Sequence, residues 1–223
     1  MEPAADSTPN FTLEARKVTK SFPGKTLWKD WSFSVPSHAI TVLTGISGSG
    51  KTTLLNCLGR LDQFDSGDLS FPGIPCGDRA SQNDRIFFRD VVGFLFQNYG
   101  LVENWTVKQN LEVALHRFGR LSRSCKVSSI SDALEIVGLK GQESKKVFTL
   151  SGGEQQRVAL ARLSMKKPSI ILADEPTSAL DERNSALVMD ILRKLAQLGA
   201  LVIISTHSKK IVDQCDYELP IPS

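Results

Sequence analysis

The chain has 223 residues, of which 41% are hydrophobic and 23% charged, and its formal net charge is +3. This composition is that of a globular protein with enough apolar material for a buried core, and the small charge argues against a nucleic-acid partner. No run of about 18 apolar residues and no secretory signal occurs, so we expect no membrane-spanning helix. Four cysteines without metal-type spacing suggest reduced thiols in a cytoplasmic protein.

The first part of the chain predicts a tail followed by a small sheet. Residues 1–10 are small, polar and proline-containing, so we expect a disordered tail. From Phe11 the segments FTLEARKVTKSF and TLWKDWSFSVP alternate apolar and polar positions, which is typical of strands. Pro23-Gly24 marks a turn between them. We therefore expect an antiparallel hairpin ahead of the next element.

The strongest signal lies in the segment VLTGISGSGKTTLLNCL. An apolar strand at 39–43 precedes a glycine-rich turn, and a helix with Leu54, Leu58 and Leu61 on one face follows. The turn matches G-x-x-x-x-G-K-[ST], whose backbone N–H groups surround phosphates because glycine leaves room for the anion. The strand before it and the helix after it are the context that this motif requires. We therefore predict nucleotide binding rather than an ordinary Gly/Ser-rich turn.

Two side chains of this loop carry specific chemistry. Lys51 supplies a full positive charge to the β/γ-phosphates, and the hydroxyl of Thr52 is placed to ligate Mg²⁺. The start of the helix adds a partial positive charge aimed at the same phosphates. The residues predicted to contact the nucleotide here are Gly45, Ile46, Ser47, Gly48, Ser49, Gly50, Lys51, Thr52 and Thr53.

The next stretch changes from strand patterns to helix patterns. Residues 65–67 predict a turn, 68–74 a strand, and 91–96 a buried strand that ends at Gln97. A capping-box pattern at Thr106 then begins a helix with apolar positions 111, 115 and 118, and a second helix is expected over 131–137, before Gly138. This segment predicts a mainly helical insert in an α/β protein.

Three apolar side chains, Leu101, Val102 and Trp105, stand in a polar loop at the start of this insert. One interpretation is an exposed patch that contacts a membrane partner. The other is that Trp105 packs as a hydrophobic staple against the helix that begins at Thr106. The sequence leaves both open.

The last third of the chain alternates helices and strands. The segment 152–167 predicts a helix, 169–173 a strand, 181–199 a helix and 200–206 another strand. This alternation favours a parallel sheet with helices on its faces.

Two sites in this last third have a chemical interpretation and a plain one. Asp174 and Glu175 end a buried strand, where Asp174 can hold Mg²⁺ and Glu175 can polarise a water, although acidic turn residues are common at strand ends. Ser151 precedes a glycine-bearing helix start, which is either a second anion site or a simple N-cap.

The motif order carries a family resemblance. The segment LSGGEQQR before a strand ending in Asp-Glu, with Gln97 upstream and His207 downstream, resembles an ATP-binding-cassette (ABC) ATPase from Phe11 to about Asp216. The resemblance implies an α/β P-loop NTPase with a parallel-sheet core, an N-terminal antiparallel β-subdomain and a helical subdomain at about 98–149. Residues 11–223 would then form one nucleotide-binding domain.

The resemblance also implies roles for residues that spacing alone would not single out. Phe22 stands where the family places an aromatic ring on adenine, although a Phe in a strand is more often a core residue. Gln97 is expected to touch Mg²⁺ or the attacking water, and His207 the γ-phosphate. Asp181 ends a loop that crosses to a partner subunit, and Ser178 in that loop replaces the usual Gly.

In the family, two copies face each other head to tail. The resemblance then implies that Ser151, Gly152 and Gly153 of one copy close on the ATP held by Lys51 of the other. The expected cofactors are ATP and Mg²⁺. The expected partners are a second copy of the chain and an integral membrane permease, which would hold the protein on the inner face of the cell membrane.

A finer resemblance concerns the branch of the family. ISGSGKTTLLNCLGRLD and VGFLFQNYGLVENWTVKQNL resemble the MacB/LolD/FtsE branch, and most of all subunits assigned to bacteriocin export. This implies an ATP hydrolase that drives peptide export or another envelope process. An ATP-driven scaffold or signalling module for a membrane partner shares every motif and stays open. A DNA-repair or translation ATPase is disfavoured because such proteins usually carry two cassettes or long coiled coils.

Overall fold

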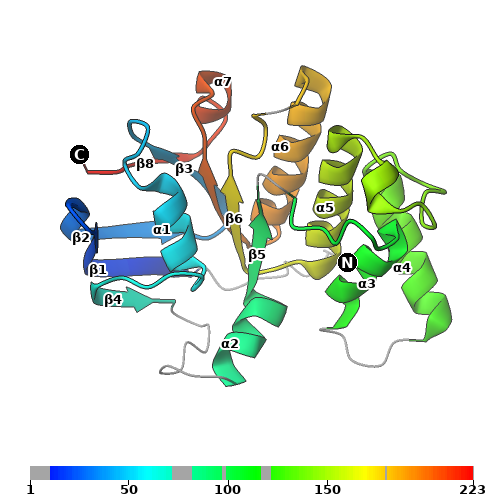
Figure 1. The fold of residues 1–223 in the computed structure, drawn as a ribbon, viewed down its shortest axis with the longest axis horizontal. Coiled ribbons are helices and arrows are strands. Elements are labelled where there is room, and N and C mark those ends of the chain that lie inside the picture. Colours follow the sequence, from blue (N-terminus) through cyan, green and yellow to red (C-terminus); the bar gives the residue numbers. More distant parts are fainter. Residues whose placement is uncertain (1–10, 72–81, 97–98, 117–121, 179, 223) are drawn as a thin grey trace, which may run out of the picture.

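The computed structural model describes residues 11–71, 82–96, 99–116, 122–178 and 180–222. Two sheets lie side by side, and helices cover the larger one (Figure 1). The expected tail at 1–10 and the predicted site residue Gln97 lie outside the described residues.

The smaller sheet is antiparallel and has the order β2-β1-β4. Its strands are β1 (Thr12–Phe22), β2 (Lys25–Pro36) and β4 (Ser66–Ser70). The predicted hairpin with a turn at Pro23-Gly24 is therefore confirmed. The third strand begins at Ser66, inside the predicted turn. A Cβ at Gly67 would lie 2.5 Å from the carbonyl oxygen of Lys17 on β1, so only glycine permits the strands to approach this closely.

The larger sheet is parallel and has the order β5-β6-β7-β3-β8. It consists of β3 (Ala39–Thr44), β5 (Val92–Leu95), β6 (Ile170–Asp174), β7 (Leu201–Ser205) and β8 (Tyr217–Pro220). The first four strands in this order match predicted apolar strands. The fifth, β8, was not predicted, because it is a short edge strand with mostly exposed side chains.

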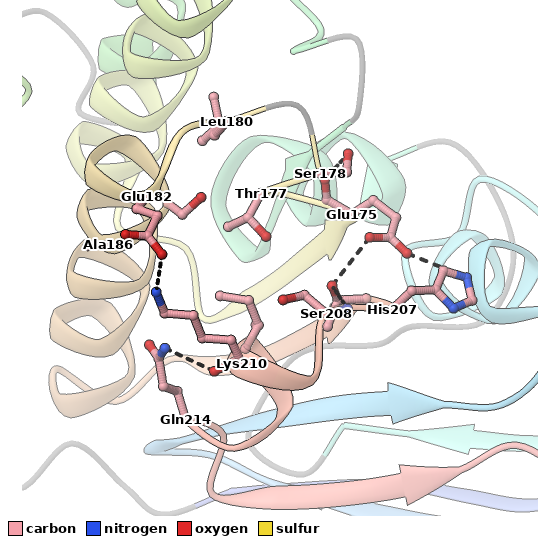
Figure 2. Close-up of a pocket in the computed structure, with 13 residues that line it drawn as sticks. Glu175, Thr177, Ser178, Leu180, Glu182, Ala186, His207, Ser208, Lys210 and Gln214 are labelled. Atoms are coloured by element: carbon pink, nitrogen blue, oxygen red, sulfur yellow. Dashed lines mark hydrogen bonds and ion pairs between the residues drawn. The ribbon is translucent and has the colours of Figure 1, made fainter.

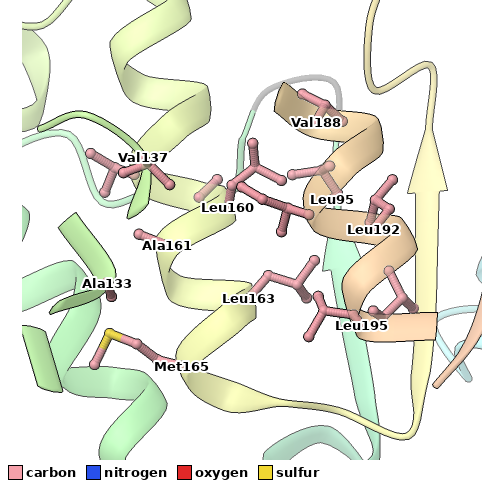
Figure 3. Close-up of a cluster of buried hydrophobic side chains, with 14 of the residues drawn as sticks. Leu95, Ala133, Val137, Leu160, Ala161, Leu163, Met165, Val188, Leu192 and Leu195 are labelled. Atoms are coloured by element: carbon pink, nitrogen blue, oxygen red, sulfur yellow. The ribbon is translucent and has the colours of Figure 1, made fainter. Parts of the chain in front are cut away.

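Helices pack on both faces of the parallel sheet: α1 (Lys51–Leu58) on one, and α5 (Gly152–Lys166) and α6 (Glu182–Gln197) on the other. Alternate residues of each strand divide between the faces. Ile171 and Ala173 of β6 belong to the core with α5 and α6, whereas Ile170 and Leu172 belong to the core with α1. Figure 3 shows the first of these cores, with leucines of α5 and α6 packed against Leu95.

The first helix is shorter than predicted. Leu54 and Leu58 are buried, but the helix ends at Leu58, and Leu61 beyond it is exposed. The expectation that Leu61 lies on the apolar face is therefore wrong. Gly59 ends the helix as its C-cap, and Arg60 then takes a left-handed φ of 59°, which turns the chain away.

The helical segment between β5 and α5 contains α3 (Val107–Leu115), α4 (Arg123–Ile136) and the short 3₁₀ turn η3 (Val147–Thr149). The capping box at Thr106 is confirmed, since its hydroxyl accepts from the backbone N–H of Gln109. The second helix begins eight residues earlier than predicted, because Ser122 provides an N-cap for the N–H of Cys125.

Besides β8 and η3, three short elements were not predicted: α2 (Gln82–Ile86), the π-turn η1 (Phe87–Val91) and α7 (Lys209–Val212). Because the π-turn includes Val91, the strand predicted at 91–96 begins at Val92, and it ends at Leu95. Across the described ranges, no helix combines the length and apolar character needed to cross a membrane. Cys57, Cys125 and Cys215 are free thiols, and burial raises the pKa of Cys57 to about 12.

Candidate nucleotide-binding site

The glycine-rich loop connects β3 to α1 at the carboxyl end of the parallel sheet. Gly48 and Gly50 have φ angles of 76° and 98°, a region that other residues rarely adopt. A Cβ at Gly50 would lie 2.3 Å from Cζ3 of the buried Trp28 on β2. The antiparallel sheet therefore packs directly against the start of α1, and glycine is required there for space as well as for conformation.

Lys51 lies inside this loop. Its side chain is 8% exposed, and Nζ donates to the carbonyl oxygens of Gly45 at 2.8 Å and Ile46 at 3.1 Å. Within the described part of the chain, the hydroxyl of Ser49 is buried without a hydrogen-bond partner. A buried polar group without a partner is costly, so a ligand in the loop would satisfy it. The loop thus contains one ammonium group, that of Lys51, and one hydroxyl, that of Ser49, which has no hydrogen-bond partner in the described part of the chain; both are available to a ligand.

Thr52 and Asp174 meet although 122 positions separate them. The Thr52 hydroxyl donates to Oδ2 of Asp174 at 2.8 Å, and the Ser205 hydroxyl donates to Oδ1. Hydroxyl and carboxylate oxygens are hard ligands that suit Mg²⁺, which usually takes one or two protein ligands and completes its shell with water and phosphate oxygens. The residues present therefore fit the ion. Among the residues that the structure describes, no cluster of three or more His, Cys, Asp or Glu side chains could hold a metal ion.

Glu175 follows Asp174 in a left-handed conformation with φ of 47°. Its N–H donates to the carbonyl oxygen of Ser205 at 3.0 Å, and its Oε2 accepts from the hydroxyl of Thr206 at 3.3 Å. Its Oε1 is buried and lies 3.7 Å from Nε2 of His207, too far for a hydrogen bond (Figure 2). Both residues line a hollow of about 440 Å³. One carboxylate oxygen is therefore left to accept a proton from a ligand or water.

The helix start at Ser151 is already capped from within. The Ser151 hydroxyl and N–H both donate to Oε2 of Glu154 at 2.8 Å, and the Glu154 N–H donates back to the hydroxyl. These bonds hold the pKa of Glu154 below its ordinary value, the backbone N–H having the largest effect. Both interpretations of Ser151 thus have support, because it is an N-cap at a helix start that accepts an anion.

The structure does not bring Ser151 and Lys51 together in one copy. The helix that follows Ser151, α5, packs on one face of the parallel sheet, and α1 with Lys51 packs on the other (Figure 1). Beside Gly152 and Gly153 there is room, since a Cβ would meet only the Tyr99 hydroxyl at 3.4 Å or Asn184 Nδ2 at 3.6 Å. This second helix start is therefore open toward a partner.

Two further predicted residues, Phe22 and Asp181, have clear positions. Phe22 is 46% exposed at the end of β1, so it is no core residue, and Nζ of Lys20 lies 5.3 Å from its ring centroid. Asp181 caps α6, where its Oδ1 accepts from the N–H of Asn184 at 2.8 Å and its Oδ2 from the side-chain amide at 2.9 Å.

Sequence reasoning missed Ser205 and Thr206, which hold the two carboxylates in place. Their signal was present in ALVIIST, where two hydroxyl residues end a buried strand beside the Asp-Glu pair.

Residues 28–178 match the family model of the ABC transporters. The chain belongs to the ABC transporter family. It is 40% identical to the lipoprotein-releasing system ATP-binding protein LolD 2 of Chlorobaculum tepidum, across 92% of this chain and 87% of that protein. It is 35% identical to the cell division ATP-binding protein FtsE of Streptococcus pneumoniae, across 90% and 87%.

A third relative is much longer than the matched region. This ABC chain is 37% identical to the macrolide export ATP-binding/permease protein MacB of Photorhabdus laumondii, across 92% of this chain but only 32% of that protein. The three relatives place the chain close to the LolD/MacB/FtsE branch, and they serve different processes.

Solved structures show the same cassette. The dimeric structure of MJ0796, a bacterial ABC transporter cassette, superposes with a TM-score of 0.84 at 30% identity and 94% coverage of both chains. A post-hydrolysis dimer of MJ0796 bound to ADP and Pi has the same TM-score at 29% identity. The predicted ABC ATPase fold is therefore confirmed, and the chain is an ABC ATPase that hydrolyses ATP to energise a permease.

Proposed function

We propose that this ABC ATPase drives a separate membrane permease that exports a peptide of the bacteriocin type or another envelope substrate. The observation that carries the proposal is the hydrogen bond from Thr52, the neighbour of Lys51, to Asp174, the neighbour of Glu175, at the carboxyl end of the parallel sheet. Outward transport is supported by two relatives, one named for lipoprotein release and one for macrolide export. Through its permease, the protein would lie on the cytoplasmic face of the membrane.

The phosphate-binding half of the site is assigned as follows. Lys51 exchanges its loop carbonyls for the β/γ-phosphates, and the backbone of residues 45–53 surrounds them. Thr52 and Asp174 would hold Mg²⁺. When bound, this ion neutralises charge on the phosphate oxygens.

The hydrolytic half centres on Glu175. Its Oε1 accepts a proton from the attacking water, while the Thr206 hydroxyl fixes the orientation of the other oxygen. His207 stands beside it with a largely exposed side chain and contacts the γ-phosphate. Gln97, outside the described residues, keeps its predicted contact with Mg²⁺ or the water.

We also propose that the working unit is a head-to-tail dimer. The separation of Ser151 and Lys51 on opposite faces of the sheet supports this, since a partner copy can bring the two helix starts to one nucleotide. Gly152 and Gly153 would approach the partner's ATP, and the loop that ends at Asp181 would cross to the partner. In this unit Phe22 stacks on adenine. Lys20 lies over one face of the ring, and the half-exposed ring would offer its other face to the base.

The permease would dock on the helical subdomain, at about 98–149 of a single nucleotide-binding domain that spans 11–223. Val102 and Trp105 are 45% and 41% exposed, whereas Leu101, the third member of the predicted patch, is partly buried and packs against the core. Asn110 occupies the position of a staple partner and is polar, and it bonds to both backbone groups of Val102. This favours the contact-patch interpretation of Trp105 over the staple, because the loop is held without its help.

A hollow of about 600 Å³ lies near this loop, between β5, η1, α3 and α5. Aromatic side chains line it together with Arg85, Arg89 and Arg162, and Arg162 also donates to the carbonyl oxygen of Gly100 at 2.7 Å. Aromatic and basic walls suit a permease segment with an apolar anchor and acidic flanks.

The test is to express the tagged chain in its own host, solubilise the membranes and identify the membrane protein that co-purifies. The pair is then placed in vesicles and ATP-dependent movement of peptide is measured. Trp105→Ala should lower the ratio of permease-stimulated to basal ATP hydrolysis by about five- to tenfold, as expected for a central aromatic contact. An unchanged ratio would remove Trp105 from the docking surface.

The FtsE relative favours a second candidate, an ATP-driven scaffold for a cell-envelope partner without transport. The same vesicle assay distinguishes the export function from the scaffold function. A partner that stimulates ATP hydrolysis while no peptide, lipoprotein or small-molecule cargo moves would replace export by this mechanical function.

A further inference from the structure

The tip of the β1–β2 hairpin places two different side chains beside each other. Phe22 and Lys25 face each other across the two-residue turn Pro23-Gly24. Proline at the first turn position and a φ of 80° at Gly24 fit a type II turn. The aromatic ring and the ammonium group are therefore carried by one tight turn.

Lys25 reaches from this turn into the glycine-rich loop. Its Nζ donates to the carbonyl oxygen of Gly48 at 2.8 Å, in the middle of the phosphate-binding motif. Although Lys25 itself is exposed, the hairpin behind it is fixed. Trp28 packs against Gly50, and the N–H of Ser21 donates to Oδ2 of Asp65 at 2.6 Å. The contact thus comes from an anchored element, not from a free strand end.

Two ammonium groups therefore bind carbonyls of the same loop. Lys51 approaches from the start of α1 and donates to Gly45 and Ile46, whereas Lys25 approaches from the hairpin and donates to Gly48. Over the residues that the structure describes, neither lysine forms an ion pair with a carboxylate. A neutral carbonyl is a weaker partner for an ammonium group than a phosphate oxygen. Both lysines can therefore gain by exchanging a carbonyl for a phosphate.

We propose that Lys25 is a second phosphate-binding cation of the nucleotide site, supplied by the hairpin that also carries Phe22. Its flexible four-carbon stem allows the ammonium to leave Gly48 and meet the polyphosphate as a point charge. One rigid turn then recognises the nucleotide at two places, by the ring at the base and by the charge at the phosphates. This inference rests on ATP binding, which the family shows, and not on the proposed export.

The test compares nucleotides with three, two and one phosphates. Lys25→Met keeps the apolar stem and removes the charge, and Lys29→Met is the matched control, four residues further along β2 and also exposed. Binding of ATP, ADP and AMP is measured by titration calorimetry in EDTA, so that no ATP is hydrolysed. We expect Lys25→Met to raise the Kd for ATP about tenfold and for ADP about threefold, and for AMP by less than about twofold.

Lys25→Arg should keep most of the ATP affinity, and Lys29→Met all of it. Equal losses for ATP and AMP would overturn the proposal, because Lys25 would then only fasten the hairpin to the loop. An unchanged Kd for ATP in Lys25→Met would overturn it as well. Thermal unfolding of each variant without nucleotide checks that the fold is intact. A parent chain that binds no ATP would instead contradict the ATPase assignment.

Discussion

The two helix starts that we assign to phosphate binding differ in the groups that occupy them. The start of α1 has Gly50 at its N-cap and no side-chain cap, so its N–H groups are left for a ligand. The start of α5 has a complete capping box, in which the Glu154 carboxylate accepts hydrogen bonds from the N–H and the hydroxyl of Ser151. The first site is preformed, whereas the second already holds an anion from its own helix. In the proposed dimer, the partner's nucleotide would have to displace Glu154 from Ser151, so closure would cost more than nucleotide binding alone.

The largest effect should come from removing the cation of the preformed site. Lys51→Ala leaves only backbone donors for the β/γ-phosphates, so we expect turnover to fall by at least about 10³-fold and ATP affinity by about tenfold or more. Phosphate release and calorimetry measure the two. Hydrolysis at the parent rate would contradict the assignment of this loop. Lys140→Ala, on an exposed lysine of the helical segment, is the control.

The next largest effect should separate closure of the dimer from the hydrolysis of ATP. Glu175→Gln keeps the shape of the side chain and removes its basic oxygen, so turnover should fall about 10²- to 10³-fold while nucleotide binding survives. Since the step after closure is blocked, the variant should elute as a dimer in Mg·ATP and as a monomer in ADP during size-exclusion chromatography. A monomer at saturating ATP would mean that closure requires the permease. An unchanged rate would show that Glu175 is not the base.

The smallest effect should come from changing Glu154, which caps the start of α5. Glu154→Gln retains a capping side chain but removes its charge, so we expect the ATP-dependent dimer of the Glu175→Gln background to tighten by about three- to tenfold. The concentration dependence of elution measures this. A weaker dimer would show that Glu154 assists closure instead of competing with it.

The same substitution has a pH signature. The folded-state pKa of Glu154 is lowered, so its contribution to stability is present above the unfolded value, near 4.5, and is lost as pH falls through the lower folded value. The parent should therefore exceed Glu154→Gln in free energy of unfolding by about 0.5–1 kcal/mol at neutral pH. The difference should shrink as the pH falls below about 4.5 and disappear once the pH is below the lowered folded-state pKa, as urea unfolding would show.

The parts of this fold that follow a local pattern could be predicted from sequence. The strand–loop–helix around Lys51 and the apolar strands ending at Asp174 and Ser205 have the period and the turn residues of their structures. The parts fixed by tertiary contacts could not. β8 becomes a strand only because β3 offers it an edge, and Leu61 lost its place in the core because the chain turns at Gly59.

The candidate site shows the same division. Motif spacing located the cation, the hydroxyl and both carboxylates, but it could not reveal that Glu154 fills the second helix start or that Lys25 reaches Gly48. Each of these contacts depends on a side-chain orientation or on the docking of one sheet against another, and neither leaves a period in the sequence. Gln97 and its role stay a prediction.

The packing of Trp28 against Gly50 has an optical consequence. The indole lies in contact with the glycine that begins α1, and its buried Nε1 has no hydrogen-bond partner among the residues described. Trp31 is its neighbour at a ring distance of 5.9 Å, and Trp105 belongs to the distant helical segment. A shift of the helix start on filling of the loop would change the surroundings of this chromophore first. We therefore expect the fluorescence of Trp28 to report nucleotide binding, because the same close approach that makes glycine obligatory places the indole beside the loop.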